Sequence, residues 1–413
     1  MSSGHDMSGL AGAAVPAGDG GRSRLSHGRR IVAALAVTQT IGYGALYYAF
    51  SVFLVPMTAD LHATGPQVAA AFTLAVLTTA ACAPLVGRLL DAHGGRVPMS
   101  VGSVLATLAL LAWSQVNSLP QLYGVLAAIG VASALVLYEP AFAVIVTWFD
   151  GPEAGRRANA LLTVTIVAGF ASSIFLPLSG MLVQRYGWRT ALVVLAVIYG
   201  SGAVPLHALV LRRRPTAAVR PARRGEPVRA VVRTRPFRLL VLAFTAHSGA
   251  VATIAVLLVT YLIRLGHSPA FAATVAGLLG VLSVTGRLVT TTLRRRWPAA
   301  PVAASVFVLQ GAGAALLPLA GRTPAGAIGC VLAFGAGFGV GTITLPHLLA
   351  ERYGTAAYAG LSGRIALFSV ANRAAAPLGA IALAQAVGYG AVMAAVAGAC
   401  ALAAGALLAY DRA

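Results

Sequence analysis

Long apolar stretches separated by short polar breaks dominate this chain. A membrane-spanning helix needs about 20 mostly apolar residues, and twelve stretches meet that length. They are predicted near residues 31–57, 66–86, 97–115, 120–148, 158–183, 189–211, 239–263, 269–292, 301–319, 325–349, 358–385 and 387–409. The breaks between them are marked by Gly, Pro and charged residues. The pattern predicts an all-α membrane protein with twelve transmembrane helices.

Composition supports this prediction and changes the interpretation of the N-terminus. Hydrophobic residues make up 58% of the chain and charged residues 10%, against about 25% charged in soluble domains. Residues 1–30 are predicted to be a disordered cytoplasmic tail, because 1–28 are rich in Gly, Ser and Ala and hold no apolar core. They are not interpreted as a signal peptide, because the apolar run that follows is too long to be a cleaved one.

The net charge of +20 comes from arginines, which are distributed unequally between the loops on the two sides of the predicted membrane. Most of the 30 basic residues fall in the tail, the C-terminus 410–413 and alternate loops. The opposite loops hold only Arg185, Arg189, Arg264 and Arg322. The positive-inside rule then puts both termini in the cytoplasm, as in a multi-pass protein of the cytoplasmic (inner) membrane. The basic run 212–238 is interpreted as a cytoplasmic linker that touches anionic membrane lipids, and nucleic acid is not expected as a partner.

The linker 212–238 divides the predicted spans six and six, into 31–211 and 239–409. The tripeptide Gly-Arg-Leu occurs at 87–89 and again at 286–288, 199 residues later. Leu176-Pro177-Leu178 is matched by Ala376-Pro377-Leu378 at nearly the same separation. Two agreeing registers indicate a duplicated chain, and so two pseudo-symmetric six-helix bundles.

The loop after the second predicted helix reads Gly87-Arg88-Leu89-Leu90-Asp91-Ala92-His93-Gly94-Gly95-Arg96. It resembles the G-x-L-a-D-r-x-G-r-k loop of the major facilitator superfamily, with Ala92 in place of one basic residue. The resemblance implies that superfamily's two-bundle fold and gating residues at Gly87, Asp91, Gly94 and Arg96. Asp91 can accept hydrogen bonds from a neighbouring helix N-terminus, and Arg96 can pair with it.

Within the superfamily the chain is similar to the monocarboxylate transporter and oxalate/formate exchanger branch. The stretches that carry this likeness are Gly42-Tyr43-Gly44, Tyr138-Glu139-Pro140, Trp148-Phe149, Arg156-Arg157, Gly286-Arg287 and Arg373. One departure affects coupling: Ser283 stands where symporters of the branch carry an aspartate. Drug/proton antiporters of the superfamily usually carry an arginine in the fourth helix and a Gly-Pro pair in the fifth. Here the fourth helix begins without a basic residue and the fifth lacks a Gly-Pro pair, so drug export is less favoured.

Few charged residues fall inside the predicted spans, and each costs at least about 2.5–3.5 kcal/mol at mid-span. Arg373 and Arg287 are candidate ligands for a substrate carboxylate, which a planar guanidinium binds through two donors. Arg287 has an alternative, in which its side chain extends to the cytoplasmic interface. Glu139 has three: counter-ion to an arginine, proton-coupling group, or residue facing water. Arg364, near a helix start, is interpreted as an interface residue.

Aromatic and imidazole side chains complete the candidate site. Tyr43 and Tyr47 lie four residues apart on one helical face, and Tyr138 precedes Glu139. Their rings and hydroxyls are candidates for substrate binding, with helix packing as the alternative. His247 is a substrate or proton candidate, with a packed core histidine as its alternative, and His347 is treated alike.

No metal-ligand cluster, nucleophile–base arrangement or carboxylate pair occurs in the sequence. Cys82, Cys330 and Cys400 are interpreted as packing residues. No cofactor, metal or enzymatic activity is expected. The sequence therefore predicts a monomeric secondary transporter that moves a small organic anion, a monocarboxylate or dicarboxylate, with protons or a counter-transported anion as coupling partners. An exporter of drugs or metabolites is the alternative, and a membrane sensor or enzyme ranks below it.

Overall fold

The structure is a computed structural model that describes residues 19–150, 154–211 and 228–413. The described residues form helices joined by short turns. In the first half these are α1 (Asp19–Tyr43), η1 (Gly44–Tyr48), α2 (Ala49–Asp60), α3 (Gly65–His93), α4 (Arg96–Ser114), α5 (Leu119–Val136), α6 (Tyr138–Trp148), α7 (Ala154–Gly169), α8 (Ala171–Pro205) and η3 (Leu206–Val210). In the second half they are α9 (Val228–Val231), α10 (Arg235–Arg264), α11 (Pro269–Leu293), α12 (Ala299–Ala320), α13 (Pro324–Gly335), α14 (Val340–Tyr353), α15 (Tyr358–Ala386) and α16 (Tyr389–Asp411).

The predicted number of membrane crossings follows from these helices. The described residues contain 11 helical stretches that are long and apolar enough to cross a membrane. One of them, Gly155–Val210, has 56 residues, or about 84 Å at 1.5 Å per residue, against a hydrocarbon core of about 30 Å. Gly187 breaks it with a φ of 76°, a left-handed conformation that favours glycine. The stretch is therefore two crossings, which makes twelve in the part of the chain that the structure describes.

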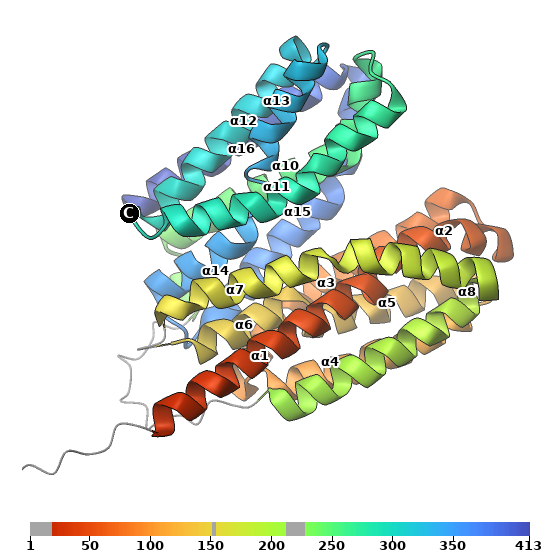
Figure 1. Ribbon diagram of the computed structural model, residues 1–413, viewed down its shortest axis with the longest axis vertical. Coiled ribbons are helices and arrows are strands. Elements are labelled where there is room, and N and C mark those ends of the chain that lie inside the picture. Colours follow the sequence, from red (N-terminus) through yellow and green to blue (C-terminus); the bar gives the residue numbers. More distant parts are fainter. Residues whose placement is uncertain (1–18, 151–153, 212–227) are drawn as a thin grey trace, which may run out of the picture.

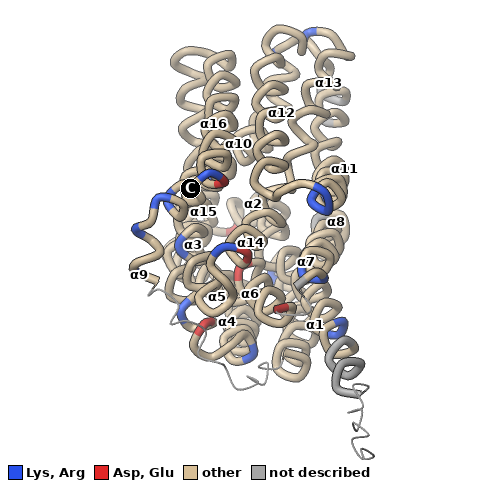
Figure 2. Tube along the Cα trace, turned by 90° about the vertical axis from the view of Figure 1, so that its left-hand side faces the viewer, with Lys and Arg blue, Asp and Glu red and all other residues tan. Residues whose placement is uncertain are grey.

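The twelve crossings form two bundles, one from each half of the chain. In Figure 1 the bundles lie close together at the end where α1 begins and α16 ends, and they diverge toward the other end. Across the divide, α3 packs against α15, α6 against α14 and α15, and α7 against α11 and α14. We call the converging end, which also holds most of the arginines visible in Figure 2, the basic end. The all-α, twelve-helix, two-bundle prediction is confirmed.

Two predicted boundaries differ from the structure. Residues 19–30 were expected within a disordered tail, but α1 begins at Asp19. A helix already formed by the apolar residues after Arg30 extends into polar sequence at little cost, because only nucleation is expensive. The second bundle begins at Arg235, where Thr234 caps α10, and not at 239. Residues 1–18 and most of the predicted linker, 212–227, lie outside the described residues.

A polar cluster fixes the opposite end of the first bundle. Trp188 Nε1 donates to Asp60 Oδ2 at 2.8 Å, and Arg189 pairs with the same carboxylate. Arg189 also donates to the carbonyl of Val116 at 2.9 Å and lies over the Trp188 ring. The cluster therefore joins α2, α8 and the turn between α4 and α5, which favours movement of this bundle as one body.

Asp60→Asn is expected to lower stability by about 0.5–1 kcal/mol at neutral pH, the scale of an exposed ion pair. The hydrogen bond from Trp188, and then Arg189, lowers the pKa of Asp60 below its usual value. A carboxylate with a lowered folded-state pKa stabilises the fold above its unfolded pKa of about 3.9, and this contribution is lost as pH falls further. Thermal unfolding in detergent should show a deficit at pH 7 that shrinks at lower pH. Asp411→Asn, in the exposed C-terminal turn, is the control, and an equal loss in both variants would contradict the prediction.

Candidate functional site

Tyr138 and Glu139 occupy a break in the fourth membrane crossing. The helix stops at Leu137, whose ψ of −156° is extended, and restarts as α6 with Pro140 in its first turn. The break frees the carbonyl of Val136, and Gln39 Nε2, fully buried on α1, donates to it at 2.7 Å. Such a break is tolerated in a membrane when side chains satisfy the freed backbone groups. Gln39 was not among the predicted residues, since a glutamine in an apolar run gives no signal of its partner.

The first crossing contains a π-helical turn, η1, at the same level. The ring centroid of Tyr43, the residue before this turn, lies 4.5 Å from that of Tyr138 and 6.2 Å from that of Tyr47. Tyr48 joins the group, 5.4 Å from Tyr47 and 6.5 Å from Tyr43. The wider turn brings Tyr48 beside residues that a regular α-helix would place on another face. The structure thus brings the three predicted tyrosines together and adds a fourth that a 3.6-residue period did not indicate.

Arg287 lies between the two bundles, with a side chain that is buried. Its Nε donates to the carbonyl of Gly339 at 3.1 Å, and its Nη1 donates across the divide to the carbonyl of Thr165 at 3.2 Å. Gly339 ends the irregular turn between α13 and α14, where a Cβ would lie 2.5 Å from Arg287 Nε. The guanidinium is therefore held inside the protein in this state and does not extend to the membrane interface.

Arg373, sixteen residues into α15, is exposed. It is close enough to interact electrostatically with Tyr43 and Glu139 of the first bundle and with His247 of the second. Within the described part of the chain its guanidinium forms no hydrogen bond or ion pair. An arginine placed between two bundles at mid-span, with all its donors free, is suited to bind an anion.

Glu139 contacts the second bundle through a hydroxyl. Ser362 Oγ donates to Glu139 Oε2 at 2.6 Å, joining α15 to α6. Among the described residues Glu139 forms no ion pair with Arg287 or Arg373, although Arg373 is within electrostatic range. In this state the glutamate therefore acts as a hydrogen-bond acceptor between the bundles.

The two candidate histidines are both engaged. His247 is buried, stacks on Phe307 with centroids 4.0 Å apart, and lies 3.0 Å from Gln310 Oε1 through Nε2. Gln310 in turn donates to the carbonyl of Phe334 at 3.0 Å, so its oxygen faces the ring as an acceptor. His347 lies at the basic end, 3.3 Å from Glu351 one turn along α14. The contacts of His247 are those of a packed core histidine.

Asp91 joins the bundles at the basic end. Its Oδ1 accepts from the Ala359 backbone N–H at 3.0 Å and its Oδ2 from that of Gly360 at 2.7 Å, at the start of α15. We call this pair of bonds the α15 latch. Gly87 permits the approach, because a Cβ there would lie 2.2 Å from the Ala359 carbonyl oxygen.

The other predicted gating residues have different contacts. Gly94, with a φ of 73°, ends α3 in a left-handed turn that donates to the Leu90 carbonyl. Arg96 begins α4 and is exposed, and it forms no ion pair with Asp91 among the described residues. The cation within electrostatic range of Asp91 is Arg364, whose Nη1 donates to the Gly360 carbonyl at 2.7 Å.

A second carboxylate meets the same segment. Asp150 Oδ2 accepts from Thr355 Oγ1 at 2.8 Å, just before α15, while Oδ1 pairs with Arg157 at 3.3 Å. Arg157 is held in turn by the Phe149 carbonyl. Asp91, Glu139 and Asp150 of the first bundle thus all accept hydrogen bonds from the eight residues between Thr355 and Ser362. Asp150 was not among the predicted residues, because its partner Thr355 is 205 residues away.

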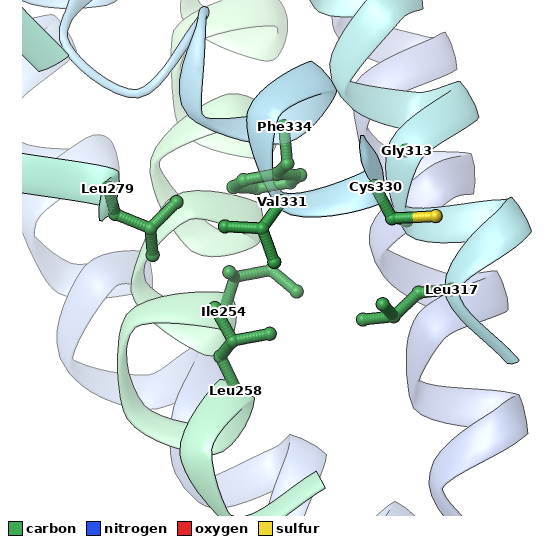
Figure 3. Close-up of a pocket in the computed structure, with 9 residues that line it drawn as sticks. Ile254, Leu258, Leu279, Gly313, Leu317, Cys330, Val331 and Phe334 are labelled. Carbon is green, nitrogen blue, oxygen red and sulfur yellow. The ribbon is translucent and has the colours of Figure 1, made fainter. Parts of the chain in front are cut away.

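A small cavity in the second bundle is separate from these residues. Figure 3 shows its lining, which is apolar and comes from α10, α11, α12 and α13, with Cys330 among it. Its volume of about 10 Å³ is near the minimum for one water, and it offers no polar side chain to hold one. It is a packing gap and offers nothing to bind an anion.

Comparison with known proteins agrees with the geometry. Residues 35–377 match the family model described as Major Facilitator Superfamily. The chain belongs to the major facilitator superfamily. It is 26% identical over 337 residues to monocarboxylate transporter 13 of Bos taurus, covering 80% of this chain and 76% of that protein. Over 29% of this chain it is 31% identical to monocarboxylate transporter 12 of Xenopus laevis, covering 25% of that protein.

Solved structures share the fold. A bacterial homologue of the iron transporter ferroportin, in an outward-facing state, matches with a TM-score of 0.75 over 93% of this chain and 100% of that one, at 16% identity. The E. coli fucose:proton symporter matches with a TM-score of 0.70 over 92% of this chain and 98% of that one, also at 16% identity. The resemblance to the monocarboxylate transporter branch is confirmed by the curated relatives, and the protein is a multi-pass membrane transporter. No cluster of three or more potential metal ligands occurs among the described residues.

Proposed function

We propose that this transporter moves a small monocarboxylate across the cytoplasmic membrane by alternating access. The observation that carries the proposal is Arg373, a mid-span guanidinium between the bundles with no protein partner among the described residues. The names of the curated relatives, monocarboxylate transporters 12 and 13, support the same class of substrate. The basic end faces the cytoplasm in this proposal, because the arginines concentrate there.

Charge balance favours one carboxylate over two. Arg287 and Arg373 contribute two positive charges near the centre, and in this proposal Glu139 is ionised and contributes one negative charge. A monocarboxylate would neutralise the remaining positive charge. A substrate-loaded site without net charge costs least to enclose in the low-dielectric interior. A dicarboxylate would leave one uncompensated negative charge. Arg287 also has two of its donor nitrogens engaged by carbonyls, so a single guanidinium is free for the substrate.

Alternating access is supported by the contacts at the basic end. The α15 latch, the Asp150–Thr355 bond and the Glu139–Ser362 bond close the passage there. The other end has its own ties within the first bundle, through Asp60, Trp188 and Arg189. These contacts support the proposal that the carrier is open away from the cytoplasm in this structure.

Uptake into proteoliposomes tests the proposal. We expect accumulation of at least one of radiolabelled acetate, lactate and benzoate, with malonate and oxalate transported at least about tenfold more slowly. Each compound is measured with and without a pH gradient, which also reports whether protons are coupled. Uptake of the dicarboxylates at equal rate would refute the charge argument. Transport of none of the five, together with export of a hydrophobic dye, would replace the proposal by drug export.

A further inference from the structure

Helices α11 and α14 run side by side from the centre to the basic end. Arg287 of α11 bonds to Gly339, 52 residues later, at the start of α14. Arg294, seven residues after Arg287 and directly after the last residue of α11, is within electrostatic range of His347 and Glu351 of α14. The offset is 53 residues between 294 and 347, so the two helices stay in parallel register over two turns. We call the surface between these two contacts the α11–α14 seam.

The seam carries polar side chains on one face of each helix. Arg287, Thr290 and Thr291 of α11 follow the spacing of one helical face, and Arg294, the residue that caps the C-terminal end of α11, continues it at i+7. The register puts Thr344 of α14 level with Thr291. A polar stripe therefore leads from the buried central arginine to a second arginine at the basic end.

Several of these polar atoms are buried without a hydrogen-bond partner. They are the hydroxyls of Thr290, Thr291 and Thr344 and the Nε of Arg294. Thr290 is 1% exposed and Thr344 is 0% exposed. A helical threonine ordinarily bonds to the carbonyl four residues earlier, as neighbouring Thr292 does to Leu288. Each buried group without a partner costs about 1–3 kcal/mol, and apolar residues there would avoid the cost.

Helix α7 of the first bundle covers the seam. The Thr165 carbonyl of α7 accepts from Arg287 at one end, and Arg157 of α7 is within electrostatic range of His347 at the other. Between them Leu161 and Val164 are buried. Because α7 belongs to the opposite bundle, the movement that opens the basic end would carry this cover away and expose the unpartnered donors to water.

We propose that the α11–α14 seam is the cytoplasmic half of the substrate route, with Arg294 and the threonine hydroxyls of the seam forming a second carboxylate site at its mouth. This inference rests on the proposed function of the central site. In the state with the basic end open, a carboxylate from the cytoplasm binds Arg294 first and passes along the hydroxyls to Arg287 and Arg373.

The test compares the two faces of the membrane in vesicles of defined orientation. The probe is whichever of acetate, lactate and benzoate the unmodified protein transports fastest. Arg294→Gln is expected to raise the KM for substrate presented at the basic end about tenfold, with the KM at the opposite face unchanged within twofold. Thr290→Val and Thr344→Val, which keep the side-chain shape, are expected to raise the same basic-end KM about threefold.

Arg295→Gln and Arg296→Gln are the matched controls, because both neighbouring arginines are exposed and lie outside the seam. Normal elution on size-exclusion chromatography establishes that each variant is folded. If Arg294→Gln behaves like the controls, or changes KM equally at both faces, the second site does not exist. If the unmodified protein transports no carboxylate, the proposed function fails first and the seam proposal with it. If Arg373→Ala loses transport but Arg294→Gln has the unmodified protein's KM at both faces, the seam proposal is rejected and the proposed function stands.

Discussion

Replacement of Arg373 by alanine is expected to lower kcat/KM for the transported monocarboxylate at least about thirtyfold. Removing one partner of a buried, hydrogen-bonded charge pair costs about 2–5 kcal/mol, and each 1.4 kcal/mol is a factor of ten. The loss should fall mainly on this residue, because Arg287 already donates to the carbonyls of Gly339 and Thr165. Initial uptake rates over a range of substrate concentrations give the change.

Arg373→Lys separates charge from geometry. Lysine keeps the positive charge but lacks the planar pair of donors, so we expect a loss of about tenfold, between wild type and alanine. Arg322→Gln, an exposed arginine in the turn between α12 and α13, is the control for general effects of charge removal. Wild-type uptake by Arg373→Ala would disprove the role of this residue in binding the carboxylate.

The helices and the α15 latch could be predicted from the sequence because both depend on short-range patterns. Apolar runs of about 20 residues identify the crossings. The Gly87 to Arg96 loop predicts a carboxylate at a helix end facing another helix N-terminus, and Asp91 forms that contact with Ala359 and Gly360. The predicted pairing of Asp91 with Arg96 is absent among the described residues: Arg96 is exposed, and the cation within electrostatic range of Asp91 is Arg364.

The rest depended on irregular backbone and on contacts between halves. Tyr48 contacts Tyr43 and Tyr47 because of the π-helical turn, and no residue in this apolar segment indicates such a turn. Asp150 and Thr355 are brought together by the closure of the bundles. The same reason applies to the second hydrogen bond of Arg287, because its acceptor, the Thr165 carbonyl, is 122 residues away on the other bundle. Contacts between residues that lie far apart in the chain produce no periodic pattern in the sequence.

Asp91→Asn is expected to shift the carrier toward the state that is open at the basic end. Both carboxylate oxygens of Asp91 accept backbone N–H bonds at the N-terminus of α15, where the helix dipole favours a negative charge. Asparagine keeps one acceptor and turns an N–H₂ group toward the second backbone donor. The loss of one charge-assisted bond and weakening of the other amounts to about 2–4 kcal/mol, or roughly a 30- to 1,000-fold change in the equilibrium. Spin labels at positions 156 and 295, exposed at the basic end of each half, should report a longer distance.

Gly87→Ala provides an independent route to the same shift. Its methyl group would lie 2.2 Å from the Ala359 carbonyl oxygen, so α3 and α15 could not approach as closely, although the Asp91 carboxylate is intact. Gly169→Ala, where a Cβ meets nothing within 4 Å, is the matched control. The labels are introduced after Cys82, Cys330 and Cys400 are replaced by serine. If Asp91→Asn and Gly87→Ala both keep the wild-type distance, the α15 latch does not hold the basic end closed, and closure must depend on Asp150 and Glu139. If Gly87→Ala opens the basic end and Asp91→Asn does not, helix packing and not the carboxylate sets the equilibrium.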